Sequence, residues 1–336
     1  MKKVLFRADA NSKMGVGHVM RSVALAQYLT RQNIQVRFLT ITESDAIRGY
    51  LKNQKFETVF LEIKDSEESF KDILNQLNQG FDWLVLDNYN FAERHHKKAK
   101  ETNVRLMVIS DTPPYSQSAD LVLNHALQDR NFRSSDARYL FGTQYALIRQ
   151  ELTTSAKRER KGKQNLLVTL GGGSFPDLLE KIIRALNLFV DLNLNVKVLY
   201  GFSVDQKSIQ IETHHKIDFL SQSLEIREYL DWADLCISAA GGTSWELCFF
   251  GVTGIIGVVA DNQANIARNL DQQGIFKSVG NYRNCSEVNL AAELKKLLTN
   301  ESLIDQMRSR ARKLVDGKGP ERIFQAMCKA ELQIVK

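Results

Sequence analysis

One segment constrains the fold of this chain more than any other: an apolar strand that runs into a glycine loop and then into an amphipathic helix. The strand covers Lys3 to Arg7, and Gly15-Val16-Gly17-His18 opens the helix. Apolar residues then recur at helical spacing, at Val19, Val23 and Ala26. Glycines let the backbone turn tightly and approach a ligand. The order of strand, loop and helix N-terminus therefore predicts an α/β unit with an anion-binding site.

His18 falls in the first turn of this predicted helix. The positive end of the helix dipole disfavours a protonated imidazole, which keeps the ring available as a base. We therefore expect His18 to be a general base that takes a proton from water or from a hydroxyl. The alternative is an ordinary turn between a strand and a helix, because a lone Gly-x-Gly is a weak signal.

The length and composition of the chain are those of a globular protein with two domains. Of its 336 residues, 43% are hydrophobic and 25% are charged. The net charge of +6 favours an anionic ligand. The longest basic run, Lys157 to Lys163, is interrupted by Glu159 and fits a solvated linker better than an arm that binds nucleic acid. We expect no nucleic-acid partner.

The cysteine spacing and the apolar run from Val252 to Ala260 argue against a metal-binding, disulfide-bonded or membrane protein. The cysteines lack the spacing of metal ligands, so we expect no zinc site, no disulfide framework, and reduced thiols in a cytoplasmic protein. We also expect no other metal and no cofactor. The apolar run from Val252 to Ala260 is too short to span a bilayer. We expect a monomer that does not insert into membranes.

Strand-like and helix-like segments alternate along the first half, which predicts a mostly parallel sheet covered by helices. The expected strands are Val4 to Arg7, Val36 to Leu39, Trp83 to Leu86 and Val104 to Ile109. The later two end in Asp87-Asn88-Tyr89 and Ser110-Asp111, and such polar residues gather at one sheet edge. A polar stretch near 153–163 marks the boundary between domains 1–155 and 164–336. We leave open that the last helix packs back on the first domain.

The second half repeats the opening pattern. A strand from Asn165 to Leu170 runs into Gly171-Gly172-Gly173, and a helix follows with Ser174 or Asp177 as its cap. Farther along, another strand runs from Asp234 to Ser238. It leads into the turn Ala239-Ala240-Gly241-Gly242 and a helix that begins near Thr243-Ser244-Trp245-Glu246. Small residues, hydroxyls and a helix start predict a diphosphate site, with Glu246 on the ribose hydroxyls. The alternative is a glycine pair that serves close packing alone.

The remaining polar positions give secondary candidates. Asp261, Asn262 and Gln263 follow a strand and either bind a sugar or a diphosphate or cap the next helix. His125 follows a strand end and is a site candidate. We expect solvated surface positions for the other histidines outside the first loop, namely His95, His96, His214 and His215.

Several motifs carry a family resemblance. The chain resembles the UDP-2,4-diacetamido-2,4,6-trideoxy-β-L-altropyranose hydrolases of pseudaminic acid biosynthesis. The matching segments run through both halves in order: Phe6 to Ala10, Gly15 to Arg21, Asp87-x-Tyr89, Asp120 to Asn124, Gly142-x-x-Tyr145 to Arg149, Gly171-Gly172, Gly241 to Glu246, and Asp261-Asn262-Gln263. The segment from Ala240 to Glu246 is also similar to GT-B glycosyltransferases that use nucleotide sugars.

The resemblance implies a GT-B architecture, in which two Rossmann-like, doubly wound α/β domains face a central cleft. It implies that His18 activates water, that the C-terminal domain holds UDP, and that the anomeric C–O bond breaks with inversion and without a metal. The catalytic residues that follow by position are His18, Tyr89 and Asn262. The substrate-binding residues are Asp9, Gly15, Gly17, Arg21, Asn124, Arg149, Gly171, Gly172, Gly241, Gly242, Thr243, Ser244, Glu246, Asp261 and Gln263.

The chain departs from the family pattern at two places. Asn88 stands where the family often has histidine, and Ser110-Asp111 stands where the family has a paired acidic motif. A glycosyltransferase that uses a UDP-sugar donor and a non-catalytic protein that binds a nucleotide sugar are the alternatives. A nicotinamide-dependent enzyme is disfavoured because Met20 occupies the third glycine position of Gly-x-Gly-x-x-Gly.

Overall fold

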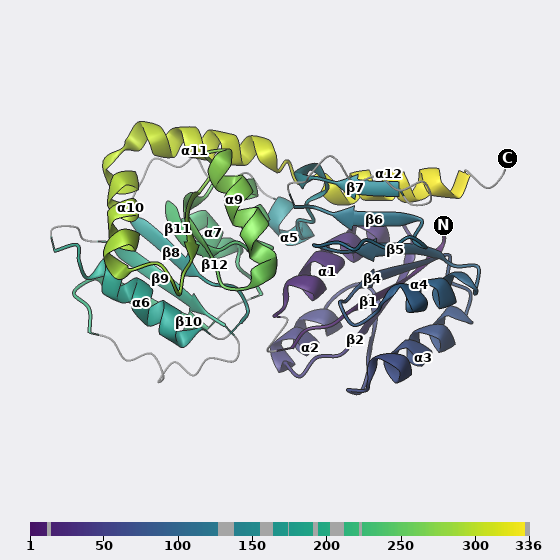
Figure 1. Cartoon of the computed structure of the whole chain (residues 1–336). Helices are drawn as coiled ribbons and strands as arrows, with labels where there is room; N and C mark the ends of the chain where they lie inside the picture. The colour runs from purple at the N-terminus through teal and green to yellow at the C-terminus, as the bar shows by residue number, and fades with distance from the viewer. Residues whose placement is uncertain are drawn as a thin grey trace. The chain divides into compact units, whose positions relative to one another are not determined.

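The computed structural model describes residues 1–11, 15–126, 138–154, 164–173, 175–190, 194–201, 212–221 and 224–332. The chain divides into two compact units, which we treat separately (Figure 1). The first unit comprises Met1–Thr153 and Gly317–Lys336, and the second comprises Thr154–Asp316. The first unit thus takes its last helix from the end of the chain, the arrangement that the sequence left open. The predicted linker from Lys157 to Lys163 lies outside the described residues.

A parallel sheet in the order β3-β2-β1-β4-β5-β6-β7 forms the centre of the first unit. Its strands are β1 (Lys3–Ala8), β2 (Gln35–Thr40), β3 (Glu57–Phe60), β4 (Trp83–Asp87), β5 (Arg105–Ile109), β6 (Leu121–Asn124) and β7 (Arg138–Phe141). The strand order reverses between β1 and β4, whose register places Ala8 opposite Asp87. Open α/β sheets bind ligands beyond the carboxyl ends of the strands at such a switch point.

Helices cover both faces of this sheet. They are α1 (Gly17–Arg31), α2 (Asp45–Lys52), α3 (Ser66–Leu77), α4 (Glu93–Lys100), the 3₁₀ turn η1 (Thr143–Tyr145), α5 (Gln150–Thr153) and α12 (Gly319–Leu332). Helix α1 packs on β1, β2 and β4 and also against α12, whereas α3 packs on β1 and α4 packs on β5. Because both faces are covered, strand β4 is buried along its whole length and consists mainly of apolar residues.

The packing between the sheet and α3 forms one core of the first unit. Leu5, Leu84 and Leu106 of three neighbouring strands contact Phe70 and Ile73 of α3 in one buried cluster. Burying such side chains stabilises the unit by roughly 1.5–3 kcal/mol each. The core therefore holds the strand ends that carry the polar residues.

Helix α12 is fastened to the first unit by specific contacts. Trp83 Nε1 donates to Glu331 Oε1 at 3.1 Å, and Arg105 Nη2 donates to the carbonyl of Glu331 at 3.2 Å. At the other end of the helix, a Cβ added to Gly319 would lie 2.1 Å from the carbonyl oxygen of Ala146. The absence of a side chain at Gly319 therefore lets α12 approach the η1 turn closely.

The second unit also has a parallel sheet, in the order β10-β9-β8-β11-β12-β13. The strands are β8 (Asn165–Thr169), β9 (Asn195–Tyr200), β10 (Lys216–Ser221), β11 (Leu235–Ala239), β12 (Thr253–Val258) and β13 (Lys277–Asn281). The helices are α6 (Pro176–Leu186), α7 (Arg227–Trp232), α8 (Thr243–Phe250), the 3₁₀ turn η3 (Asp261–Gln263), α9 (Ala264–Gln272), α10 (Glu287–Thr299) and α11 (Glu301–Leu314). Its core joins Val168, Ile237 and Ile255 to Ile182 of α6 and Leu294 of α10.

The predicted α/β architecture with two parallel sheets is confirmed. One local prediction is wrong. Helix α6 begins after Phe175 with Pro176 at its first position, so Asp177 does not cap it, and Ser174 lies outside the described residues. None of the helices that the structure describes is long and apolar enough to cross a membrane.

The expected solvation of the histidine pairs is also largely wrong. His95 and His96 are buried, and His95 Nδ1 accepts a hydrogen bond from the backbone N–H of Ala92 at the start of α4. Burial lowers the pKa of His96. His215 is buried as well and bonds to the carbonyl of Leu186 at 2.8 Å, whereas His214 is exposed. The rings of His95 and His215 bond to backbone groups at helix ends, which the local polarity of the sequence does not reveal.

Candidate functional site

The candidate site of the first unit lies at the carboxyl ends of β1 and β4, where α1 begins. Gly15 has a φ of +69°, a left-handed conformation that favours glycine, and its N–H donates to the carbonyl of Asn11 at 2.8 Å. This turn leads directly into α1, whose second residue is His18. The predicted place of His18 in the first helical turn is therefore observed.

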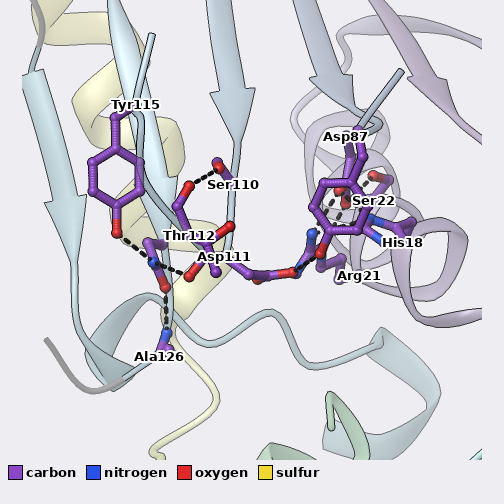
Figure 2. Close-up of polar contacts among 11 residues, drawn as sticks. His18, Arg21, Ser22, Asp87, Ser110, Asp111, Thr112, Tyr115 and Ala126 are labelled. Carbon is purple, nitrogen blue, oxygen red and sulfur yellow. Dashed lines mark hydrogen bonds and ion pairs between the residues drawn. The ribbon is translucent and has the colours of Figure 1, made fainter. Parts of the chain in front are cut away.

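His18 is held by a buried carboxylate. Its Nδ1 lies 2.6 Å from Oδ1 of Asp87, and Ser22 donates its hydroxyl to Asp87 Oδ2 at 3.2 Å (Figure 2). An ionised carboxylate only accepts hydrogen bonds, so in the neutral ring Nδ1 carries the proton and Nε2 carries the lone pair. Among the residues that the structure describes, no side chain or backbone group bonds to Nε2 of His18.

Arg21 joins two carboxylates next to this pair (Figure 2). Its Nε and Nη2 each lie 2.6 Å from an oxygen of Asp87, and Nη1 lies 2.6 Å from Oδ1 of Asp111. Burial alone would raise the pKa of Asp87, but Arg21 and His18 outweigh it and hold that pKa below its usual value. The pKa of Asp111 is held well below its usual value because Arg21 likewise outweighs burial. Both carboxylates are therefore ionised at neutral pH.

Tyr89 stands beside the imidazole. Its ring and that of His18 meet edge to face, with centroids 4.7 Å apart and planes at 89°. The Tyr89 hydroxyl lies 2.6 Å from Oδ2 of Asp111, and 49% of the residue is exposed. The structure thus brings the predicted residues His18, Arg21 and Tyr89 together around two carboxylates.

Other predicted residues of the first unit bond to the protein itself. Asp9 accepts from the backbone N–H of Ile41 at 2.7 Å and pairs with Arg7 at 3.0 Å, and it also accepts from the amide of Asn88. Asn88 in turn accepts from the N–H of Asn90 at 2.8 Å. Asp9 therefore steadies the loop that carries Tyr89.

Arg149 and His125 are buried in the same unit. Arg149 pairs with Glu151 at 3.3 Å. Burial, followed by the charge of Arg21, lowers the pKa of His125 to about 4, so its ring is neutral at neutral pH. The role of Arg149 in substrate binding and the place of His125 in the site stay predictions.

In the second unit the candidate site follows β8, β11 and β12. Gly171 has a φ of +83°, and a Cβ on Gly201 would lie 2.0 Å from the carbonyl oxygen of Gly173. The loop after β8 therefore rests on the end of β9, and it leaves Gly171 and Gly172 at the carboxyl edge of the sheet.

The loop after β11 contains the predicted diphosphate residues. Gly241 and Gly242 precede α8, Thr243 is its first residue, and Glu246 lies one turn into it, half-buried. Ser244 is fully buried and its hydroxyl contacts the carbonyl of Ala239 at 3.4 Å. The side chain of Ser244 therefore serves the turn, while its backbone N–H lies at the helix start.

The loop after β12 lies beside this turn. Gln263 Oε1 accepts from the N–H of Val259 at 3.0 Å, and a Cβ on Gly241 would lie 3.6 Å from Gln263 Nε2. Asp261 and Asn262 are exposed, and neither caps α9. The structure thus brings the two predicted loops together within the second unit.

The sequence-based list of site residues left out Asp87 and Asp111. Asp87 is the last residue of β4 and Asp111 lies two residues after the end of β5, so a polar residue at the carboxyl end of a strand is the signal that identifies them. Among the described residues, no group of three or more His, Cys, Asp and Glu side chains could hold a metal ion.

The chain matches one protein-family model and is similar in sequence to several known proteins. Residues 165–319 match the model of the glycosyltransferase family 28 C-terminal domain. The chain is 24% identical over 330 residues to the spore coat polysaccharide biosynthesis protein SpsG of Bacillus subtilis, covering 94% of this chain and 95% of SpsG.

Two further relatives match over shorter segments. The chain is 26% identical over 279 residues to the uncharacterized protein MJ1062 of Methanocaldococcus jannaschii, covering 76% of this chain but only 55% of that protein. It is 26% identical over 232 residues to the UDP-2,4-diacetamido-2,4,6-trideoxy-beta-L-altropyranose hydrolase of Campylobacter jejuni, covering 64% of this chain and 79% of the hydrolase.

Solved structures support the fold. Acinetobacter baumannii MurG has a TM-score of 0.72 and 18% identity, covering 98% of this chain and all of that chain. S. aureus MnaA, in a co-structure with UDP, has a TM-score of 0.70 and 14% identity, covering 100% of this chain and 98% of that chain. The chain thus has the GT-B fold, matches the glycosyltransferase family 28 C-terminal domain over residues 165–319, and resembles the UDP-diacetamido-trideoxy-altropyranose hydrolases as its motifs predicted.

Proposed function

We propose that this chain hydrolyses UDP-2,4-diacetamido-2,4,6-trideoxy-β-L-altropyranose to UDP and free 2,4-diacetamido-2,4,6-trideoxy-L-altrose, a step of pseudaminic acid biosynthesis. The observation that carries the proposal is the bond of 2.6 Å between Nδ1 of His18 and Asp87. It leaves Nε2 as the basic atom of a ring whose orientation is fixed. The similarity to the Campylobacter jejuni hydrolase supports the choice of substrate.

In the proposed reaction, Nε2 of His18 takes a proton from water as the water oxygen bonds to the anomeric carbon. The C–O bond to the diphosphate breaks, its electron pair leaves with UDP, and the configuration inverts. Asp87 stabilises the imidazolium that forms, as a carboxylate does in other pairs of this kind. Arg21 and Ser22 keep Asp87 ionised and oriented.

We assign UDP to the loops of the second unit. The N–H groups at the start of α8 and the Thr243 hydroxyl would stabilise the leaving diphosphate, and Glu246 would bind the ribose. Asn262 and Gln263, with Asp261, would complete the contacts to the diphosphate or the sugar. Gly171 and Gly172 would allow close approach of the backbone.

His18→Ala tests the base assignment. We expect UDP affinity to stay near that of the wild type, and turnover to fall by about 10²–10⁴-fold because general-base assistance is lost. Asp87→Asn is the companion variant, since an amide fits the same space but no longer accepts with a full charge. UDP release and calorimetric UDP binding give the two readouts, and full activity of His18→Ala would refute the assignment.

Hydrolysis in ¹⁸O-labelled water tests the position of attack independently. Label in the free sugar supports attack at the anomeric carbon. Label in UDP would mean attack at phosphorus instead.

A glycosyltransferase that uses a UDP-sugar donor is the second candidate. The match of residues 165–319 to a glycosyltransferase domain favours it. Rapid release of free sugar in the absence of any acceptor would exclude a transferase, whereas release that requires an added hydroxyl acceptor would exclude the hydrolase.

A further inference from the structure

Asp111 has no step in the proposed reaction, yet it joins two side chains that contact His18, those of Arg21 and Tyr89. Its Oδ1 lies 2.6 Å from Nη1 of Arg21, and its Oδ2 lies 2.6 Å from the hydroxyl of Tyr89. Its side chain is 13% exposed. One carboxylate therefore connects the buried base pair to the half-exposed tyrosine.

The side chain of Asn124, at the end of β6, holds the loop that carries Asp111. The amide nitrogen of Asn124 donates to the carbonyl of Asp111 and to the hydroxyl of Tyr115, each at 3.0 Å. Its amide oxygen accepts from the N–H of Ala126 at 2.9 Å. The loop also closes on itself, since the Ser110 hydroxyl donates to the carbonyl of Thr112 at 2.9 Å (Figure 2). Asn124 is fully buried, so it fixes the backbone of Asp111, while Arg21 and Tyr89 hold the carboxylate.

The bond to Asp111 determines whether the Tyr89 hydroxyl donates or accepts hydrogen bonds. An ionised carboxylate accepts only, so the hydroxyl of Tyr89 donates its proton to Asp111. Toward a further partner, the phenolic oxygen then acts as an acceptor. Its ring lies edge to face with His18, so a ligand group that meets this oxygen lies close to the base.

We propose that Asp111 is a positioning residue that fixes the Tyr89 hydroxyl as an acceptor, and that Tyr89 thereby selects sugars with a hydrogen-bond donor beside the reacting carbon. The inference rests on the proposed function and adds to it the basis of sugar recognition. A 2,4-diacetamido-2,4,6-trideoxy pyranose offers two amide N–H groups and one ring hydroxyl as donors. A sugar that offers only acceptors there would be rejected, because two acceptors cannot share a hydrogen bond.

The test compares the Kd for UDP with the Kd for UDP-2,4-diacetamido-2,4,6-trideoxy-β-L-altropyranose, both measured by calorimetry in a His18→Ala background. The ratio of the Kd for UDP to the Kd for the UDP-sugar measures the affinity that the sugar adds to that of the nucleotide. We expect Tyr89→Phe and Asp111→Asn each to reduce this ratio by about threefold to tenfold, the range of one hydrogen bond, with the Kd for UDP unchanged.

The double variant shows whether Asp111 acts through Tyr89. If it does, Tyr89→Phe combined with Asp111→Asn loses no more than the larger single loss, because the two changes remove one interaction. Losses that multiply would mean a separate structural effect of Asp111 and would overturn the proposal. If Asp111→Asn does not fold, Tyr89→Phe alone decides. A Kd ratio in Tyr89→Phe equal to that of the parent also overturns the proposal.

Tyr50→Phe is the matched control. Its hydroxyl bonds to a carboxylate of the same unit, Glu151 Oε1, at 2.7 Å, and we expect its ratio to equal that of the parent. A parent protein that gains no affinity from the sugar would overturn the proposed substrate together with this inference. If the sugar still adds its full affinity in Tyr89→Phe, the inference is wrong but the proposed substrate is not.

Discussion

A histidine serves as a base only when its tautomer and orientation suit the proton that it must take. For His18 both are set by Asp87, a residue 69 positions away in the sequence. Arg21, three residues after His18 and so on the same helix face, balances the charge of that carboxylate. The chemistry of the first unit therefore depends on one short helix segment and the ends of two strands.

The ionised carboxylates of this cluster predict an acid-sensitive first unit. Because the pKa of Asp111 is lower in the folded protein than in the unfolded chain, the stabilisation is present above about pH 4 and is lost as the pH falls below that. We expect Asp111→Asn to cost about 2 kcal/mol at pH 7 and less at pH 3, where the wild type has lost part of this advantage.

Urea unfolding at the two pH values measures this difference, followed by the fluorescence of Trp83 in a background with Trp232→Phe and Trp245→Phe, which removes the signal of the second unit. Asp72→Asn is a suitable control, because Asp72 pairs with Lys64 at the surface, and such pairs contribute about 0–1 kcal/mol. An unchanged gap between wild type and Asp111→Asn from pH 7 to pH 3 would contradict the explanation.

At the scale of elements, both candidate sites follow the same rule. Polar loops lie at the carboxyl ends of parallel strands, where helix N-termini also point. In the first unit the rule brings together the ends of β1, β4 and β5, and in the second it brings together the ends of β8, β11 and β12. Close packing of these loops on neighbouring strands then fixes their shapes.

Gly201 gives a test at this scale. Adding a Cβ there would place it 2.0 Å from the carbonyl oxygen of Gly173, so Gly201→Ala must displace the loop after β8. We expect a loss of about 1–3 kcal/mol in the stability of the second unit and weaker UDP binding.

Gly49→Ala is the control for the glycine change. Gly49 lies within α2, and an added Cβ would meet nothing within 4 Å. The control should gain about 0.5–1 kcal/mol from helix propensity. Thermal unfolding and calorimetric UDP titration check both variants, and a Gly201→Ala protein of wild-type stability would show that the loop does not need the close approach.

At the scale of the whole molecule, the chain builds two units, each with a buried core of its own. Leu84 belongs to the core of the first unit and Leu235 to that of the second, and both are fully buried. We expect Leu84→Ala and Leu235→Ala each to destabilise its own unit by about 2–5 kcal/mol.

Hydrogen exchange read by peptide distinguishes the two effects. Leu84→Ala should raise exchange in β1, β4 and β5, and Leu235→Ala should raise it in β8, β11 and β12. Equal increases in both units from either variant would show that the units unfold as one.

The sequence alone determined the strands, the glycine loops, the two parallel sheets and the family resemblance. These features depend on local spacing, since apolar runs, glycines and helix starts act within a few residues of one another. From the same pattern came His18, Tyr89 and the turn from Gly241 to Glu246 as candidates.

Only the tertiary structure decided which polar groups meet. Asp87 becomes the partner of His18, Asp111 becomes the partner of Arg21 and Tyr89, and His95 and His96 become buried rather than solvated. It also gave the last helix to the first unit. Such contacts join residues far apart in the chain, and strand order and register set them, so no local pattern of residues could specify them.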